Sequence, residues 1–212
     1  IYVGEQTATP ERLAEIRRVM GLDRPLHVQY ADFLWKALHG DLGRSLQTSR
    51  PVVDEIMTRL PSTVILAVAA MLLAVVLGFG LGLLSGLRQN TVLDSAAMLV
   101  ALFGVSMPVF WLALLLIMLF AVQLHWLPAT SVAGWRGLVL PAVSLALLSA
   151  ATLARLVRAS ILEVLQLEFL MPARAKGLSG AVVVLRHALP NAVLPVLTAM
   201  GLQFGALLSG AV

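Results

Sequence analysis

The stretch TVILAVAAMLLAVVLGFGLGLL, residues 63–84, decides the fold class of this chain. It lies inside a segment without charged side chains that is bounded by Arg59 and Arg88. A helix of about 20 consecutive apolar residues is long enough to cross the hydrocarbon core of a bilayer. Inside that core every backbone N–H and C=O group must find a partner within the protein, which favours helices. The stretch therefore predicts a transmembrane α-helix.

The composition of the chain also indicates a membrane protein. Of its 212 residues, 59% are hydrophobic and 12% are charged, and the mean hydropathy is +0.93. Soluble domains carry roughly 25% charged residues, about twice this share. The absence of cysteine excludes disulfides, thiolate metal sites and cysteine nucleophiles. The chain does not begin with Met and ends in an apolar run, so we expect a fragment of a longer polytopic protein.

Further apolar runs predict three more spans. Residues 95–135 are uncharged, and these 41 residues are too many for one span of roughly 20. Pro108 interrupts this run. We place the spans at 105–124, at 137–154 and from 191 to the end of the chain, the first of them with a helical lead-in from Ala96. The predicted fold class is an all-α integral membrane protein, a polytopic helical bundle with four spans in this chain.

The basic residues predict the orientation. Cytoplasmic loops of membrane proteins are rich in Lys and Arg. Six basic residues lie in the loops 85–95 and 155–190, whereas the loop 125–136 holds only Arg136. We therefore expect residues 155–190 in the cytoplasm and residues 1–59 outside. The net charge is +4, and the excess of basic residues lies mainly in the loops expected in the cytoplasm. This distribution suits a membrane topology better than a nucleic-acid-binding face, so no nucleic acid partner is expected.

Residues 1–59 predict a periplasmic segment of amphipathic helices. Thr9 and Pro10 are typical of a helix start, and Gly21 is typical of a helix end. Between residues 26 and 38, apolar side chains recur at intervals of three and four and form one stripe. We expect these helices to lie on the lipid surface and to pack on the transmembrane domain, residues 60–212.

Small residues follow one face of the first span at intervals of four. They are Ala70, Ala74, Gly78, Gly82 and Gly86. In lipid no hydrophobic effect drives helices together, and small side chains let helix backbones approach closely. We expect this face to pack against another helix. In the last span, Gly201, Gly205 and Ser209 repeat the pattern.

Enzymatic and metal-binding motifs are weak. Residues 177–180 have the GxSG form of an intramembrane serine protease, which needs a histidine base from another membrane helix. This motif lies in a basic loop, where a turn between two helices explains it better. The chain lacks a GxxxxGK[ST] phosphate loop, so it does not hydrolyse ATP itself. Its four histidines lack metal-ligand spacing, and neither a metal nor a cofactor is expected.

The most informative segment is EFLMPARAKGLS, residues 168–179, followed by RHALPNAVLP, residues 186–195. It resembles the cytoplasmic coupling loop of permease subunits of binding-protein-dependent ABC importers. The resemblance assigns this role to Glu168, Ala173, Arg174, Ala175, Lys176, Gly177, Leu178, His187 and Pro190. In family members a short helix of this loop docks into a groove on the ATPase subunit. Small residues permit close approach, basic residues meet an acidic partner, and a glycine with positive φ ends the helix.

Other motifs resemble the peptide/nickel branch of this family. They are GDLGRSL at 40–46, RLPST at 59–63 and GVSMPVFWL at 104–112, while FLWKALH at 33–39 looks most like nickel permeases. The family fold, the type I ABC importer transmembrane domain, has six spans, so the first and last are missing here. Pro172 and the triplet at 180–182 depart from the family pattern near the docking surface.

The resemblance implies a multi-pass permease subunit in the bacterial inner membrane, with the coupling loop at 155–190. Its implied partners are a second permease subunit, two ATP-binding subunits that hydrolyse ATP, and a periplasmic substrate-binding protein. The cargo is nickel, free or chelated, or a di- or oligopeptide. Two alternatives stay open at this point: the intramembrane serine protease, and a structural membrane subunit that transports nothing.

Overall fold

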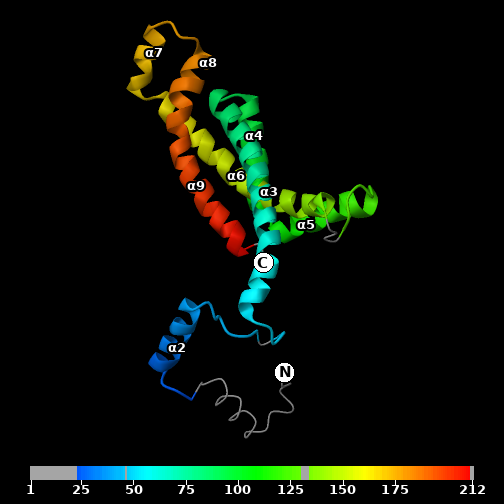
Figure 1. Cartoon of the computed structure of the whole chain (residues 1–212). Helices are drawn as coiled ribbons and strands as arrows, with labels where there is room; N and C mark the ends of the chain where they lie inside the picture. The colour runs from blue at the N-terminus through cyan, green and yellow to red at the C-terminus, as the bar shows by residue number, and fades with distance from the viewer. Residues whose placement is uncertain (1–22, 46, 130–133, 211–212) are drawn as a thin grey trace. The chain divides into compact units, whose positions relative to one another are not determined.

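The computed structural model describes residues 23–45, 47–129 and 134–210. Within these ranges every regular element is a helix, apart from one isolated antiparallel bridge between Arg44 and Pro51. The chain divides into two compact units, Ile1–Ser62 and Thr63–Val212, and each is considered by itself (Figure 1).

The described part of the first unit contains helix α2 (Leu26–Leu38). It begins after Pro25 and is followed by His39 and Gly40, whose φ of +81° is typical of a helix end. None of its residues is buried in the described part of the chain, so its apolar stripe faces outward. An amphipathic helix at 26–38 was expected, and its place on the lipid surface stays a prediction. The expected helix start at Thr9–Pro10 and end at Gly21 lie outside the described residues.

The second unit is a bundle of helices around α6. Its elements are α3 (Val52–Leu87, from Thr63 on), α4 (Val92–Ser106), α5 (Val109–Leu116), a π-helical segment (Ile117–Gln123), α6 (Trp135–Leu165), a 3-10 turn (Glu168–Leu170), α7 (Met171–Ala175), α8 (Gly180–Val182), a second π-helical segment (Val183–Ala188) and α9 (Leu189–Gly210). Helix α6 packs against α4, α5 and α9, and small residues of α3 lie directly on it. Short α7 and α8 connect α6 to α9 at one end of the unit (Figure 1).

The core of the second unit consists mainly of small side chains. Its main cluster contains Ala67, Ala70, Met71 and Ala74 of α3, Ala146, Ala150, Leu153 and Val157 of α6, and Val196 and Leu207 of α9. Half of these residues are alanines, so the helices contact each other at short distance. Such packing is typical of membrane helix bundles, where close backbone approach replaces the hydrophobic effect.

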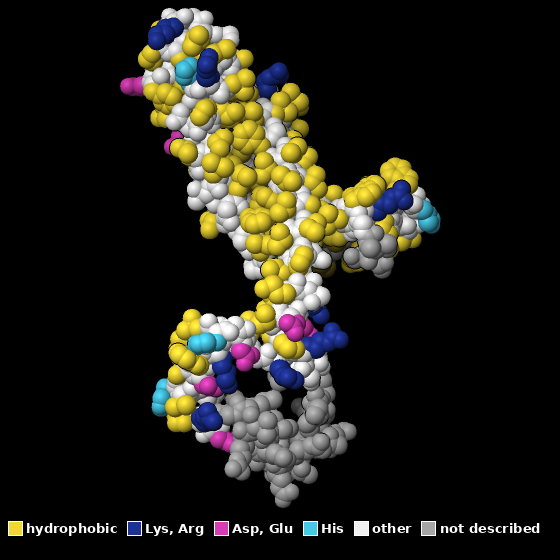
Figure 2. Space-filling view, in the orientation of Figure 1, with side chains coloured by type: hydrophobic (Ala, Val, Ile, Leu, Met, Phe, Trp, Pro, Cys, Tyr) yellow, Lys and Arg dark blue, Asp and Glu magenta, His cyan; other side chains and the backbone are white. Residues whose placement is uncertain are grey.

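The helices fit a membrane by length and composition. Val52–Leu87, Trp135–Leu165 and Gly180–Ser209 are each long and apolar enough to cross it, and the bent pair Val92–Ser106 and Val109–Gln123 makes a fourth span if it is counted as one. Figure 2 shows hydrophobic side chains over the middle of the visible face of this unit, with Lys and Arg side chains toward its ends. The predicted all-α integral membrane bundle is confirmed.

The span expected at 105–124 is wrong at its start, because residues 105 and 106 belong to α4 and α5 begins only at Val109. The chain bends by 103° between α4 and α5, so the lead-in expected from Ala96 does not continue in line into the span. The break is at Met107, which is extended with φ −85° and ψ 127°. Pro108 follows, and a proline disfavours the helical conformation of the residue before it. The sequence indicated an interruption at Pro108, but the span was placed across it.

Candidate functional site

The coupling segment, defined as residues 166–179, leaves the end of α6 through the 3-10 turn and α7. Helix α7 ends in a tight turn, in which the N–H of Lys176 donates to the carbonyl of Pro172 at 3.1 Å and the N–H of Gly177 to that of Arg174 at 3.0 Å. Gly177 has φ +74°, a conformation that glycine adopts without the strain of an L side chain. Pro172 lies in the first turn of α7, where its missing N–H needs no partner. The proline that departs from the family pattern is therefore compatible with this helix.

Two side chains anchor the coupling segment. Leu170 and Ala173 are buried in a cluster with Ile161 and Val164 of α6 and with Val183, Ala188 and Ala192 at the entry into α9. Because α6 and the entry into α9 both contribute to this cluster, the coupling segment is packed against the ends of both helices.

Most other side chains of the coupling segment face outward. All residues of the segment other than Leu170 and Ala173 are exposed, among them Glu168, Phe169, Met171, Arg174, Ala175, Lys176 and Leu178. The apolar ones are large, with Phe169 47% and Met171 63% exposed. Exposed apolar groups beside charged ones outside a membrane span are typical of a protein-binding surface.

Arg174 makes a contact that the sequence did not predict. Its guanidinium donates a hydrogen bond to the carbonyl of Leu165, the last residue of α6, at 3.1 Å. The last carbonyls of a helix lack intrahelical partners, and a basic side chain often supplies one. Arg174 therefore holds the coupling segment against α6 while its side chain remains exposed.

His187 and Pro190 lie at the entry into α9, away from the exposed surface of α7. His187 is half-buried in the π-helical segment, and its carbonyl accepts a hydrogen bond from the Asn191 side chain at 2.8 Å. Pro190 is the second residue of α9 and follows directly on the π-helical segment Val183–Ala188. The hydroxyl of Ser160 in α6 donates to the carbonyl of Ala192 at 2.8 Å, which joins α6 to the start of α9.

The GxSG motif has no catalytic surroundings. Ser179 is exposed in the loop before α8, and its carbonyl accepts the N–H of Val183 at 3.0 Å. Among the described residues its hydroxyl forms no hydrogen bond with a histidine. The loop is not part of a membrane helix, so the arrangement that a protease requires is not formed there.

The small residues of α3 lie against the backbone of α6. Ala70 and Ala74 are fully buried. A Cβ atom added to Gly78 would lie 2.6 Å from the carbonyl oxygen of Ala150, and one added to Gly82 or Gly86 would collide with α6 more severely. By contrast, no atom of the described chain lies within 4 Å of a Cβ added to Gly201 or Gly205, so the second stripe is not packed within this chain.

An ion pair between a buried carboxylate and a partly buried arginine lies near the end of α6, and the sequence did not predict it. The carboxylate of Asp94 in α4 accepts two hydrogen bonds from Arg158 in α6, Nε–H to Oδ1 at 2.7 Å and Nη2–H to Oδ2 at 2.8 Å. The hydroxyl of Ser85 in α3 and the backbone N–H of Asn90 donate to the same carboxylate. Asp94 is 4% exposed. The network joins α3, α4 and α6 at the end of the unit that carries the coupling segment.

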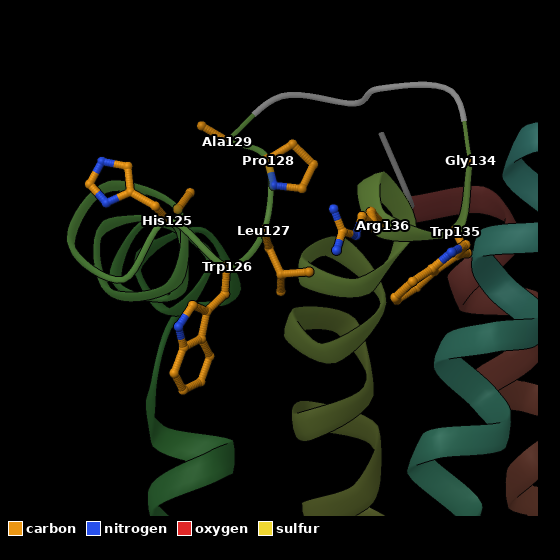
Figure 3. A pocket seen from close by; sticks show the side chains of 9 residues that line it. His125, Trp126, Leu127, Pro128, Ala129, Gly134, Trp135 and Arg136 are labelled. Carbon is orange, nitrogen blue, oxygen red and sulfur yellow. The ribbon is translucent and has the colours of Figure 1, made fainter.

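A pocket of about 530 Å³ lies between the loop that follows the π-helical segment Ile117–Gln123 and the start of α6, at the end expected to face the periplasm (Figure 3). His125–Ala129 line it from one side and Gly134, Trp135 and Arg136 from the other. The guanidinium of Arg136 lies 5.7 Å from the centre of the Trp135 ring, within the range of a cation–π contact. An aromatic and cationic pocket of this kind can contact carboxylates and ring systems.

A second cavity, of about 410 Å³, lies between α5, α6 and α9. Its lining is mostly apolar and includes Ser149, Thr152 and Gln203. Within the described chain the buried Oε1 atom of Gln203 has no hydrogen-bond partner. A buried acceptor without a donor is costly, and it suits a ligand, a water or a partner with N–H or O–H groups. Among the described residues no group of three or more His, Asp or Glu side chains could hold a metal ion.

The sequence matches two families of transport proteins. Residues 78–212 match the family described as binding-protein-dependent transport system inner membrane component, and residues 2–67 match the family of the N-terminal part of such membrane components. The glutathione transport system permease protein GsiC of Escherichia coli K12 is 41% identical over 209 residues, which are 97% of this chain and 68% of that protein.

Two peptide transporters are similar to the same extent. The dipeptide transport system permease protein DppB of Alkalihalophilus pseudofirmus is 39% identical over 238 residues, covering 99% of this chain and 71% of the relative. The di/tripeptide transport system permease protein DppB of Pseudomonas aeruginosa is 40% identical over 240 residues, covering 100% and 71%. These relatives support the peptide side of the peptide/nickel branch and not the expected likeness to nickel permeases, and nothing among them supports a protease. The chain belongs to the permease subunits of binding-protein-dependent ABC importers, multi-pass proteins of the inner membrane that are not themselves enzymes.

Proposed function

We propose that this chain is the permease subunit of an importer for short peptides, of the size of dipeptides, tripeptides and glutathione. The observation that carries the proposal is similarity over at least 97% of the chain to permeases named for the transport of glutathione, dipeptides and di/tripeptides. None of these relatives is named for the transport of nickel.

In this proposal the peptide arrives on a periplasmic substrate-binding protein, and two ATP-binding subunits on the cytoplasmic side supply the energy. A second permease subunit completes the translocation path. Side chains such as Phe103 of α4 and Leu202 of α9, which are exposed in the isolated chain, are then covered by lipid or by the second permease.

The coupling segment is proposed to dock on one ATP-binding subunit. Phe169 and Met171 offer an apolar contact, and Arg174 and Lys176 offer positive charge for an acidic rim. Leu170 and Ala173 transmit a displacement of α7 to α6 and to the entry of α9, because they are buried between these elements. When the two ATP-binding subunits close around ATP, the packed spans would move in this way. The translocation path would then open to the other side of the membrane.

The proposal is tested with the complete transporter reconstituted in lipid vesicles together with its binding protein. We expect ATP-dependent uptake of a labelled dipeptide, inhibited by excess unlabelled di- or tripeptide and unaffected by Ni²⁺. Vesicles without the binding protein are the control and should take up almost nothing. Uptake of Ni²⁺ without uptake of any short peptide would contradict the proposal.

A further inference from the structure

The ion pair between Asp94 and Arg158 is the strongest polar link between α4 and α6. Both carboxylate oxygens are engaged by one guanidinium, the fork geometry that fixes direction as well as distance. The rest of this interface is apolar. Its buried cluster consists of Ala101 of α4 and Ala151 and Ala154 of α6, with Val105 packed against it. Apolar contacts have no preferred direction, so the ion pair is the contact that fixes direction as well as distance between the two helices.

The carboxylate of Asp94 is also held from two further sides. The hydroxyl of Ser85, near the end of α3, donates to Oδ1. The backbone N–H of Asn90 donates to Oδ2 at 3.0 Å, and the positive φ of Asn90, 62°, forms part of the turn that presents this N–H. One carboxylate therefore accepts four hydrogen bonds, which come from α3, from the α3–α4 turn and from α6.

The position of this network relates it to the coupling segment. Arg158 lies seven residues before Leu165, about two helical turns from the point where the coupling segment leaves α6. Asp94 lies in the first turn of α4, and α4 leads to the 103° bend at Pro108 and to α5. Val109, the first residue of α5, lines the cavity with Ser149 and Gln203. A continuous set of contacts thus connects α7, α6, the ion pair, α4 and the bent helix.

We propose that Asp94 and Arg158 are positioning residues for transport: their ion pair joins the ends of α3, α4 and α6 into one rigid body, which carries displacement of the coupling segment to the bent helix α4–α5. The inference rests on the proposed function, because it assumes that α7 is moved by an ATP-binding subunit. The reason to favour this role over simple stability is energetic. A buried ion pair loses its hydration, and apolar side chains of similar size often stabilise a core equally well.

The test compares variants in the complete transporter, reconstituted with its binding protein in vesicles. Asp94→Asn keeps the shape of the side chain and removes its charge, and Arg158→Lys keeps the charge and removes the fork. Three quantities are measured: the amount of assembled complex, peptide uptake, and ATP hydrolysis with and without peptide-loaded binding protein. For Asp94→Asn we expect uptake per assembled complex to fall about tenfold, a typical size for a broken coupling, with a smaller fall for Arg158→Lys. Basal ATP hydrolysis should persist, so that more ATP is hydrolysed per peptide.

Matched controls separate this effect from general damage. Arg88→Lys makes the same change at an exposed arginine in the α3–α4 turn, and Asp32→Asn breaks an exposed ion pair with Lys36 in α2. Both controls should retain wild-type uptake and wild-type ATP consumption per peptide. If the wild-type transporter itself took up no short peptide, the proposed function would fail, and this outcome is distinct from failure of the present inference.

The double variant Asp94→Leu with Arg158→Met decides between positioning and stability. It removes both charges together, so neither is left buried without its partner. We expect the complex to assemble in nearly normal amounts and to hydrolyse ATP, yet to remain deficient in uptake. Restored uptake in the double variant would overturn the inference. So would single variants that reduce assembly, uptake and ATP hydrolysis in equal proportion.

Discussion

The interface between α3 and α6 and the coupling segment are built in opposite ways. At the interface, Gly78, Gly82 and Gly86 bring α3 so close to α6 that no additional methyl group fits. In the coupling segment, only Ala173 is buried among the five residues of α7, all of which are described. The first region resists relative movement, and the second is attached at few points and offers an exposed surface. The difference is suited to a subunit in which a short docked helix moves a rigid group of spans.

The largest effect is expected from overpacking the rigid region. Gly82→Leu places a side chain where even a Cβ atom would collide with the carbonyl oxygen of Ala154 and with Val157. Overpacking typically costs about 1–3 kcal/mol, and backbone contact leaves little room for relaxation. We expect most of the assembled complex to be lost, as measured by the yield of permease that co-purifies with its partners.

Gly80→Leu is the matched control for this change. Gly80 is on the same helix, and no atom lies within 4 Å of a Cβ added there. Its yield should stay close to that of the wild type. Equal yields from the two variants would mean that α3 and α6 do not pack in this way in the membrane.

A smaller effect is expected from the exposed surface of α7. Met171→Asp puts a charge among the apolar side chains proposed to dock on the ATP-binding subunit, whereas Met171→Leu preserves them. Anchor residues of protein interfaces contribute more than about 1 kcal/mol, so we expect the Asp variant to retain several-fold less ATP-binding subunit after purification. The amount of permease in the membrane should not change. Equal retention by the Asp and Leu variants would exclude Met171 from the contact.

The smallest predicted difference is between two neighbouring basic residues. Lys176→Glu reverses only the charge of the surface, while Arg174→Glu also removes the hydrogen bond to the Leu165 carbonyl. A hydrogen bond of this kind contributes about 1 kcal/mol. Uptake per assembled permease should therefore fall further for Arg174→Glu, and the thermal stability of the complex should fall for this variant alone. Identical stability of both variants would show that the bond to Leu165 contributes nothing.

Much of the fold could be predicted from the sequence because the signals are local. Charge-free runs marked the positions of the spans, although α6 continues to Leu165, beyond the end expected at residue 154. A fourfold spacing of small residues marked a face of α3 that lies on α6 in the structure. The conformation of Gly177 also follows from local rules, since a glycine after a short helix commonly takes positive φ. The role of Gly177 in docking stays a prediction, as does the cytoplasmic side of residues 155–190.

The features that were missed depend on distant parts of the chain. Asp94 and Arg158 are 64 residues apart, and nothing in the sequence near either residue indicates its partner. A local signal was present, because the N–H of Asp94 donates to the hydroxyl of Thr91 in a helix cap, but it indicated only the start of α4. Pro108 indicated that the helix is interrupted, but it did not indicate the angle of the bend between α4 and α5. That angle depends on how α5 packs against α6.

In the proposed function, movement of the ATP-binding subunits reaches the spans through the coupling segment, which must keep its conformation to transmit it. This requirement is tested most directly by one substitution at two glycines. Gly177 has φ +74°, where a β-branched side chain is strained by roughly 1–3 kcal/mol, whereas Gly180 follows the segment without positive φ and with open space around it. ATP-driven peptide uptake into vesicles is measured for Gly177→Val and Gly180→Val and divided by the amount of assembled permease. We expect Gly177→Val to lose most uptake while Gly180→Val stays near the wild type. Equal uptake by the two variants would show that the backbone conformation at Gly177 does not matter for transport.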